Sequence, residues 1–229
     1  MTDISSKTGG IDRSHDSSLW PKRVFASLHG IIVLACLWVA FGGGEWPDGL
    51  RAKVLALCAL LYFLRHLVTL FVLLQRRVEM SEVWGLLLFM AIFEVGFLLL
   101  GAGGLSGQAR PFRPVDWAGI GLVLCGSYLN TGSELQRRKW KQNPASKGHC
   151  YTGGLFAYSA HINYFGDSVL FTGWAILAAS AFAFAIPIMM TLLFIFFHIP
   201  ALDTYLAERY GDEFKTYAGK TAKFMPFVY

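Results

Sequence analysis

Long apolar runs recur along the chain and constrain its fold more than any other feature. They cover residues 24–41, 54–74, 83–100 and 117–129, and the stretch 167–198 is almost free of charged residues. A membrane-spanning helix needs about 20 mostly apolar residues. Hydrophobic residues make up 55% of the chain, compared with about 45–50% in soluble domains. We therefore predict an all-α, polytopic integral membrane protein.

The last apolar stretch is too long for one helix, because about 20 residues already span the hydrocarbon. Two helices joined near Ser180 fit it better, which gives about six transmembrane helices. Residues 1–22 are polar and lack an apolar core, so we expect a disordered cytosolic tail rather than a cleaved signal. Residues 23–229 then form a single membrane domain.

Lysine and arginine residues orient these helices. With both ends of the chain in the cytosol, most of the 20 lysines and arginines flank the spans on the cytosolic side, as the positive-inside rule requires. The net charge of +5 is therefore attributed to membrane anchoring and not to a nucleic-acid partner. Residues 200–220 are expected to form a cytosolic amphipathic helix, broken at Gly211, near the membrane surface.

A polar stretch, residues 130–167, follows the fourth apolar run and contains the most basic segment of the chain. Four of its side chains recur at i, i+4, i+8 and i+11 and so share one helical face. They are Asn130, Glu134, Arg138 and Lys141. Cations suit the phosphates of a nucleotide, and the amide and carboxylate suit ribose hydroxyls. On charge alone, ordinary positive-inside anchors are the simpler interpretation.

The second half of this stretch supports a ligand site. Gly153-Gly154 permits close backbone approach, and Asn163 and Asp167 stand where an apolar helix begins. A helix N-terminus presents unpaired N–H groups, which favour anionic or carbonyl ligands. Neither His161 nor the four cysteines show metal-ligand spacing. We therefore expect no metal site and no disulfide framework, and assign His161 to polar lining.

Ionisable side chains inside the predicted membrane helices mark a second candidate site, since such groups are costly at membrane depth. In the second helix Tyr62, His66 and Thr69 share one face. Arg65 stands next to this face and within snorkelling reach of the interface. Glu94 lies near the middle of the third helix with no cation close to it in the sequence. It is either a hydrogen-bonded structural residue or a donor to a substrate, and the sequence favours neither.

The segment 151–167, YTGGLFAYSAHINYFGD, is followed by an apolar hairpin, an acidic and aromatic helix and the residues MPFVY. This combination resembles the C-terminal domain of steroid 5-alpha-reductases and related sterol reductases, over residues 55–229 and most strongly over 130–229. The resemblance implies an NADPH-dependent membrane reductase of a C=C bond in a lipophilic, steroid- or isoprenoid-like enone. It also implies that residues 130–229 bind the nucleotide, and that the chain is a bacterial member in the inner membrane.

Residue by residue, the resemblance implies a cofactor site and a catalytic centre. The cofactor-binding positions are Arg76, Asn130, Glu134, Arg138, Lys141, Tyr158, Asn163, Asp167 and Tyr205. Tyr62 matches the catalytic tyrosine that hydrogen-bonds the substrate ketone. Glu94 and His66 are our own candidates for supporting donors to the charge that develops on this oxygen. The steroid reductases also carry a Gln-Glu pair before this tyrosine and a basic residue in the last span, which this chain lacks. The resemblance therefore supports the nucleotide pocket better than it supports steroid specificity.

Two other classes remain open. Isoprenylcysteine carboxyl methyltransferases resemble the chain in their last two helices and bind S-adenosylmethionine. Their Arg-His-Pro-x-Tyr motif falls on residues 160–164, AHINY, which lack the arginine and the proline. The cationic face also suits a phosphate-rich cofactor better than a sulfonium. The other class is a non-enzymatic scaffold or transporter, although the chain shows no internal repeat.

Overall fold

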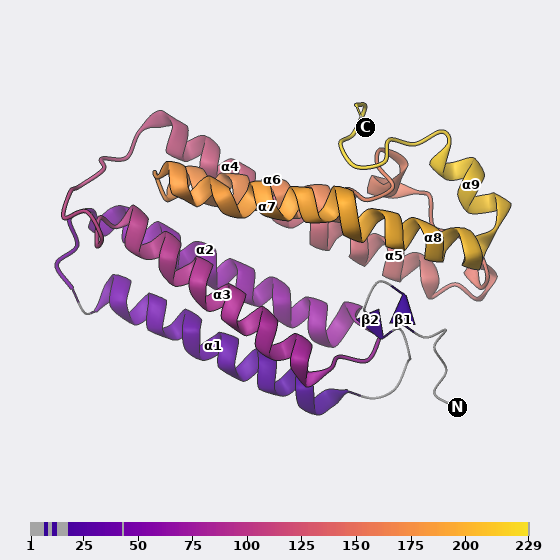
Figure 1. The fold of residues 1–229 in the computed structure, drawn as a ribbon, viewed down its shortest axis with the longest axis horizontal. Coiled ribbons are helices and arrows are strands. Elements are labelled where there is room, and N and C mark those ends of the chain that lie inside the picture. The colour runs from indigo at the N-terminus through magenta and orange to yellow at the C-terminus, as the bar shows by residue number, and fades with distance from the viewer. Residues whose placement is uncertain (1–6, 9–10, 13–17, 43, 229) are drawn as a thin grey trace.

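The computed structural model describes residues 7–8, 11–12, 18–42 and 44–228 (Figure 1). The predicted tail, residues 1–22, falls largely outside them. It does not extend to residue 22, because the first helix already begins at Leu19. Pro21 is compatible with this start, since a proline in the first turn of a helix removes an N–H that has no helical partner.

Helices dominate the described residues. In chain order they are α1 (Leu19–Phe41), α2 (Gly49–Val68), η2 (Thr69–Leu73), α3 (Met80–Gly101), α4 (Pro114–Ser127), η3 (Tyr128–Gly132), α5 (Ser133–Lys141), η4 (Pro144–Ser146), η5 (Gly154–Ala157), α6 (Ile162–Leu177), η6 (Ala181–Phe184), α7 (Ala185–Leu193), η7 (Phe194–His198), α8 (Ile199–Tyr210) and α9 (Asp212–Ala218). Two short strands, β1 (Lys7–Thr8) and β2 (Ile11–Asp12), pair antiparallel. The all-α prediction is confirmed apart from this small ladder.

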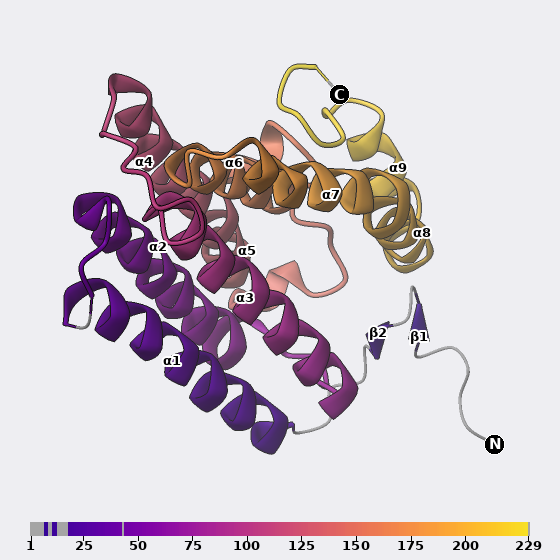
Figure 2. The same cartoon turned by 60° about the vertical axis from the view of Figure 1, so that its left-hand side comes forward.

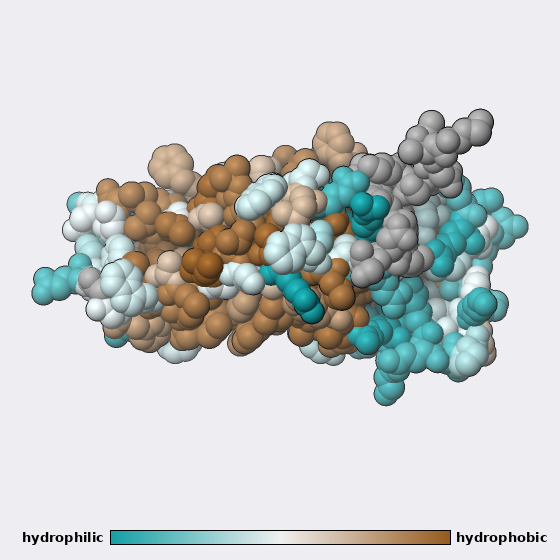
Figure 3. Space-filling view, turned by 90° about the horizontal axis from the view of Figure 1, so that it is seen from below, coloured by the Kyte–Doolittle hydropathy of each residue, from teal (hydrophilic) through white to brown (hydrophobic). Residues whose placement is uncertain are grey.

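The long helices lie along the long axis of the molecule in two groups (Figure 1). In the first group α1 contacts α2 and α3, and in the second α4 and α7 both pack on α6. The short helices α5, α8 and α9 extend beyond these groups at one end (Figure 1), and Figure 2 shows α8 and α9 beyond the end of α7. We call this the polar end, because hydrophilic residues gather there, whereas a hydrophobic belt covers most of the remaining face (Figure 3).

Four helices among the described residues are long and apolar enough to cross a membrane, which fits an integral membrane protein. They are Leu19–Phe41, Gly49–Leu73, Met80–Gly101 and Ala181–Tyr210. The other two predicted spans correspond to α4 and α6, which have 14 and 16 residues and are shorter than the four. The predicted break near Ser180 is confirmed, because α6 ends at Leu177 and the next turn begins at Ala181.

The predicted cytosolic helix, residues 200–220, is not separate from the last span. α7, η7 and α8 follow one another without interruption. In the π-helical turn η7 the N–H of Ile199 donates to the carbonyl oxygen of Phe194. This i→i−5 bond ends the π-helical turn directly before Pro200, whose nitrogen has no hydrogen to donate. The break at Gly211 is confirmed, since its φ is +55°, a left-handed conformation that glycine adopts readily.

Glycines let α4 and α6 approach very closely. A Cβ added at Gly126 would lie 2.4 Å from the carbonyl oxygen of Gly166, and one added at Gly173 would lie 2.5 Å from that of Gly119. No side chain fits at such distances, so the two helices meet backbone to backbone, as small residues allow in membrane helices. This contact holds the polar start of α6 against the end of α4.

Arg51 links three helices at the end opposite to the polar end. It belongs to the first turn of α2 and is fully buried. Its Nη1 donates to Asp116 Oδ1 on α4 and to the carbonyl oxygen of Leu177 on α6, both at 2.7 Å. A buried charge persists only when it is paired and hydrogen-bonded in this way.

Candidate functional site

A cleft of about 790 Å³ opens at the polar end, between α5, α8, α9 and the loop of residues 142–151. We call it the polar-end cleft. Four of the nine residues predicted to bind a cofactor line it: Arg76, Lys141, Asn163 and Tyr205. Further basic and aromatic residues complete the walls, among them Arg137, Tyr151, Phe156, Tyr164, Arg209, Tyr210 and Tyr217.

A smaller cavity of about 210 Å³ shares Arg137 and Lys141 with the cleft. Glu134 and Arg138 line this cavity. Glu134, Arg138 and Lys141 therefore share one face of α5, whereas Asn130, the fourth residue predicted on that face, lines neither cavity and lies in η3. Arg138 also donates to the backbone carbonyl oxygen of Val72, which fixes α5 against η2.

Positive charge is concentrated on one wall of the cleft. Burial, followed by the neighbouring guanidinium groups of Arg137 and Arg209, holds the pKa of Lys141 below its usual value, and the carboxylate of Glu134 opposes this effect. Glu134 is already ion-paired with Arg137. Lys141 nevertheless reaches the open cleft, where an anion would relieve the repulsion.

A hydrogen-bond network beneath the cleft joins α6 to the end of α4. The side-chain amide of Asn130 donates to the carbonyl oxygen of Asn163 and to Asp167 Oδ2, both at 3.0 Å. The amide of Asn163 donates to Glu134 at 3.1 Å. Asn130 and Asp167 are not among the residues that line the cleft. Asn130 instead contacts the backbone of Asn163, which lines the cleft and whose side chain bonds Glu134 in the smaller cavity.

Arg65 extends this network into the membrane helices. Its guanidinium donates to Asp167 Oδ1 at 2.8 Å and to Thr131 Oγ1 at 3.1 Å, and the residue is only 9% exposed. Arg65 therefore does not snorkel to the interface, because the Asp167 carboxylate pairs with it inside the bundle. The two residues are 102 positions apart, so only the fold could bring them together.

π-Helical turns occur in three of the helices that lead towards the polar end. They are η2 after α2, η3 after α4 and η7 after α7. Asn130 and Thr131 belong to η3, and the extra residue of such a turn changes the direction of the side chains that follow it. π-Helical turns are frequent at functional sites. Regular helical spacing could not reveal them from the sequence.

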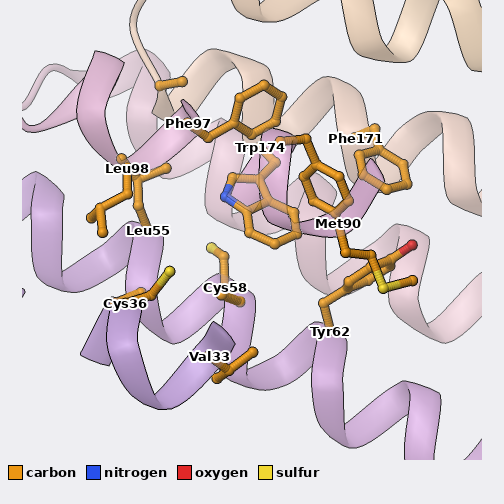
Figure 4. Close-up of a cluster of buried hydrophobic side chains, with 14 of the residues drawn as sticks. Val33, Cys36, Leu55, Cys58, Tyr62, Met90, Phe97, Leu98, Phe171 and Trp174 are labelled. Carbon is orange, nitrogen blue, oxygen red and sulfur yellow. The ribbon is translucent and has the colours of Figure 1, made fainter. Parts of the chain in front are cut away.

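Tyr62 lies deeper in the bundle, enclosed by aromatic rings (Figure 4). It is 6% exposed, and the ring centroids of Phe171 and Trp174 lie 5.4 and 5.7 Å from its own. His66, predicted to share its face, makes an edge contact at 4.3 Å. The guanidinium of Arg65 lies 5.3 Å from the Tyr62 ring, so the aromatic cluster adjoins the polar network.

Glu94 has a partner that the sequence did not reveal. The Nε2 of His29, on α1, lies 2.8 Å from Glu94 Oε1, and both side chains are fully buried. This geometry matches the structural interpretation of Glu94. The His29 ring also lies 6.2 Å from Tyr62 and 5.2 Å from His66. The His29–Glu94 pair therefore borders the predicted catalytic residues.

Several buried polar atoms around Tyr62 make no hydrogen bond within the described part of the chain. They are His29 Nδ1, Arg65 Nη1, His66 Nδ1, Glu94 Oε2 and Trp174 Nε1. A buried polar atom without a partner costs about 1–3 kcal/mol. Water or the polar group of a ligand is therefore expected to meet them.

Two residues that the sequence analysis assigned to the site, Tyr158 and His161, do not line the cleft. Tyr158 is exposed outside the cleft, with its ring 5.8 Å from that of Phe227, so the structure does not bring it to the other predicted cofactor residues. His161 is 1% exposed and its Nε2 lies 2.8 Å from Asp203, which makes it a buried link between α6 and α8. Conversely, Arg209 lines the cleft, although its helix gave only an amphipathic pattern in the sequence.

Comparisons with known proteins found relatives whose names give two different activities. The chain is 30% identical over 151 residues to "Delta(14)-sterol reductase erg24" of Schizosaccharomyces pombe, covering 53% of this chain and 34% of that protein. It is 34% identical over 113 residues to "Probable O-methyltransferase ustE" of Ustilaginoidea virens, covering 42% of this chain and 39% of that protein. The chain thus spans less than half the length of these curated relatives.

A family model matches a larger part of the chain. Residues 65–221, more than half of the sequence, match the family described as "Protein of unknown function (DUF1295)". The match contains Arg65, Glu94, the polar network and the walls of the cleft, whereas His29 and Tyr62 precede it. The chain therefore belongs to the DUF1295 family.

Proposed function

We propose that the protein is a membrane reductase that uses NADPH to reduce a C=C bond conjugated to a carbonyl group in a lipophilic substrate. The main support is the polar-end cleft with its cationic wall. Hydrogen bonds from Asn163 through Asn130 and Asp167 connect this cleft to Arg65, which lies beside the ring of the buried Tyr62. The similarity to a sterol reductase supports the same class of reaction.

The donor set of the cleft suits NADPH. Its volume of about 790 Å³ lies within the range of about 300–1,000 Å³ for small-molecule sites. Arg137, Lys141 and Arg209 offer charge-assisted hydrogen bonds to phosphate. The ring of Tyr151, which lines the cleft, offers apolar surface to a base. When bound, NADPH supplies the hydride.

Tyr62 is the proposed donor to the substrate carbonyl oxygen. Negative charge develops on this oxygen during reduction, and a preorganised donor there lowers the barrier. Arg65 places a positive charge beside the Tyr62 ring, and His66 and the His29–Glu94 pair offer further polar atoms at the same depth. Because rings enclose Tyr62 in this conformation, substrate binding requires some of them to move.

The second candidate is a methyltransferase that uses S-adenosylmethionine. Its support is the relative named a probable O-methyltransferase, at 34% identity. The cationic wall argues against it, since a sulfonium cofactor gains nothing from crowded positive charges.

Cofactor binding separates these candidates. The purified protein in lipid nanodiscs would be titrated with NADPH, NADH and S-adenosylmethionine, with the thermal midpoint and tryptophan fluorescence as readouts. NADPH alone should raise the midpoint, and lipophilic enones should then be screened for NADPH oxidation. Stabilisation by S-adenosylmethionine alone would establish the methyltransferase class, and no response to any of the three would favour a non-enzymatic role.

A further inference from the structure

An exposed apolar tip, formed by Met225, Phe227 and Val228, projects at the polar end. These residues are 42%, 85% and 75% exposed, and the Phe227 ring lies 5.8 Å from the exposed ring of Tyr158. The tip follows α9, a helix with mostly polar residues. Grouped apolar side chains that a protein leaves uncovered mark an interaction surface.

The backbone of this segment is fixed to the start of α6. Two N–H groups of residues 160–161 donate to carbonyl oxygens of residues 222–223, at 2.8 and 3.1 Å. The Ser159 hydroxyl donates to the carbonyl oxygen of Phe224 at 2.8 Å. Phe224 itself is 4% exposed and packs with its ring 5.7 Å from that of Phe165 on α6. The tip is therefore presented from a firmly held base.

The conformation of the tip directs Phe227 outward at a cost. Its φ is +66°, in the left-handed region that costs about 1–2 kcal/mol for a residue with a Cβ. The N–H of Val228 donates to the carbonyl oxygen of Met225 at 3.1 Å and closes the turn. In water this turn combines strain with an exposed aromatic ring. Transfer of the ring out of water would offset this cost.

We propose that Met225, Phe227 and Val228, with Tyr158 beside them, anchor the polar end to the membrane interface. They would insert into the headgroup–acyl boundary of the same bilayer that surrounds the long helices. Apolar and aromatic side chains at this depth are typical of interfacial anchors. This inference is independent of the proposed reaction.

The position of the tip along the molecule favours lipid as the partner that it contacts. Its base, Phe224, belongs to an apolar cluster with Phe194 and Ile199, which stand at the junction of α7 and α8. Phe196 and Phe197 at the same junction are 65% and 67% exposed, so exposed aromatic side chains of the last span stand at the level where the base of the tip packs. Figure 1 shows the end of the described chain level with this junction along the long axis.

Fluorine NMR of the full chain in nanodiscs tests the anchor without removing any cysteine. Trifluoromethylphenylalanine would be introduced by codon suppression at Phe227, at Phe197 as a reference for lipid exposure, and at Thr216 as a reference for water exposure, since Thr216 is exposed on α9. Dissolved oxygen, which concentrates in lipid, and a water-soluble gadolinium chelate would be the two relaxation probes.

The anchor predicts that the label at 227 relaxes with oxygen as strongly as the label at 197, and at least threefold less with the chelate than the label at 216. Chelate relaxation equal to that at 216 would place the tip in water and overturn the proposal. Protection from both probes would show that protein covers the tip, for instance a second copy of the chain, and would overturn it equally. A Met225→Ser, Val228→Ser variant should raise chelate access at 227 at least threefold.

Discussion

Lys141 lies close to the guanidinium groups of Arg137 and Arg209. An anionic cofactor is therefore expected to bind more tightly when Lys141 is present. Lys141→Gln should weaken NADPH binding about 10- to 100-fold, because a hydrogen bond to a charged group contributes about 1.5–3 kcal/mol. Lys139→Gln is the matched control, since it removes the same charge from an exposed position of α5 that does not line the cleft. Calorimetric titration of both variants in nanodiscs measures the difference, and equal losses would contradict a specific role.

The lowered pKa of Lys141 also has a consequence for stability. In the ligand-free protein, the charged form of Lys141 lowers the free energy of unfolding at low pH. This cost disappears as pH rises from the lowered folded-state pKa towards about 10.4, the value of an unfolded lysine. Thermal midpoints measured against pH should therefore rise for the wild type relative to Lys141→Gln over this window. Parallel curves would show that Lys141 is not destabilised by its neighbours.

Tyr62 is the residue on which the proposed chemistry depends most. Tyr62→Phe removes one hydroxyl and keeps the ring that packs against Phe171 and Trp174. Turnover should fall about 10²- to 10³-fold, as when a donor to a developing oxyanion is lost, and NADPH affinity should stay unchanged. The rate of NADPH oxidation with an enone that the wild type reduces is the measurement. Full turnover in this variant would exclude Tyr62 as the donor.

At the scale of elements, the contact between α4 and α6 is set by glycine. Gly126→Ala would place a Cβ 2.4 Å from backbone atoms of Gly166 and Leu170, and overpacking of this kind costs about 1–3 kcal/mol. Gly121→Ala on the same helix meets nothing within 4 Å, and should stabilise the protein by about 0.5–1 kcal/mol. The two thermal midpoints should therefore move in opposite directions. A stable Gly126→Ala protein would mean that the helices are not in backbone contact.

The sequence predicted some element boundaries better than others, for identifiable reasons. The break at Gly211 has a local cause, a conformation that favours glycine, and the break near Ser180 followed from the length that a bilayer permits. α7 continues into α8, which contains Pro200, through the π-helical turn η7. The direction of Asn130 likewise depends on η3. No local pattern in the sequence signals such turns.

At the scale of the whole molecule, the proposed orientation places the polar end in the cytosol. Lys147→Cys lies in the exposed loop beside the cleft, and Gln108→Cys lies in the exposed loop between α3 and α4. A membrane-impermeant maleimide should label the cysteine at 147 only from the cytosolic face and the cysteine at 108 only from the opposite face. Labelling of both from one face would overturn the orientation and the number of crossings between them.

The sequence by itself determined the membrane class, the helical composition and the basic face of α5, because hydrophobic run length and helical spacing are local properties. Only the tertiary structure decided which polar groups meet. Arg65 with Asp167 and His29 with Glu94 are pairs separated by 102 and 65 residues. Arg209 lines the same cleft as Lys141 because the last long helix continues beyond the hydrophobic belt as far as Tyr210. Such pairings depend on how the helices pack, which in α4 and α6 is set by glycine contacts, and no charge pattern along the chain specifies them.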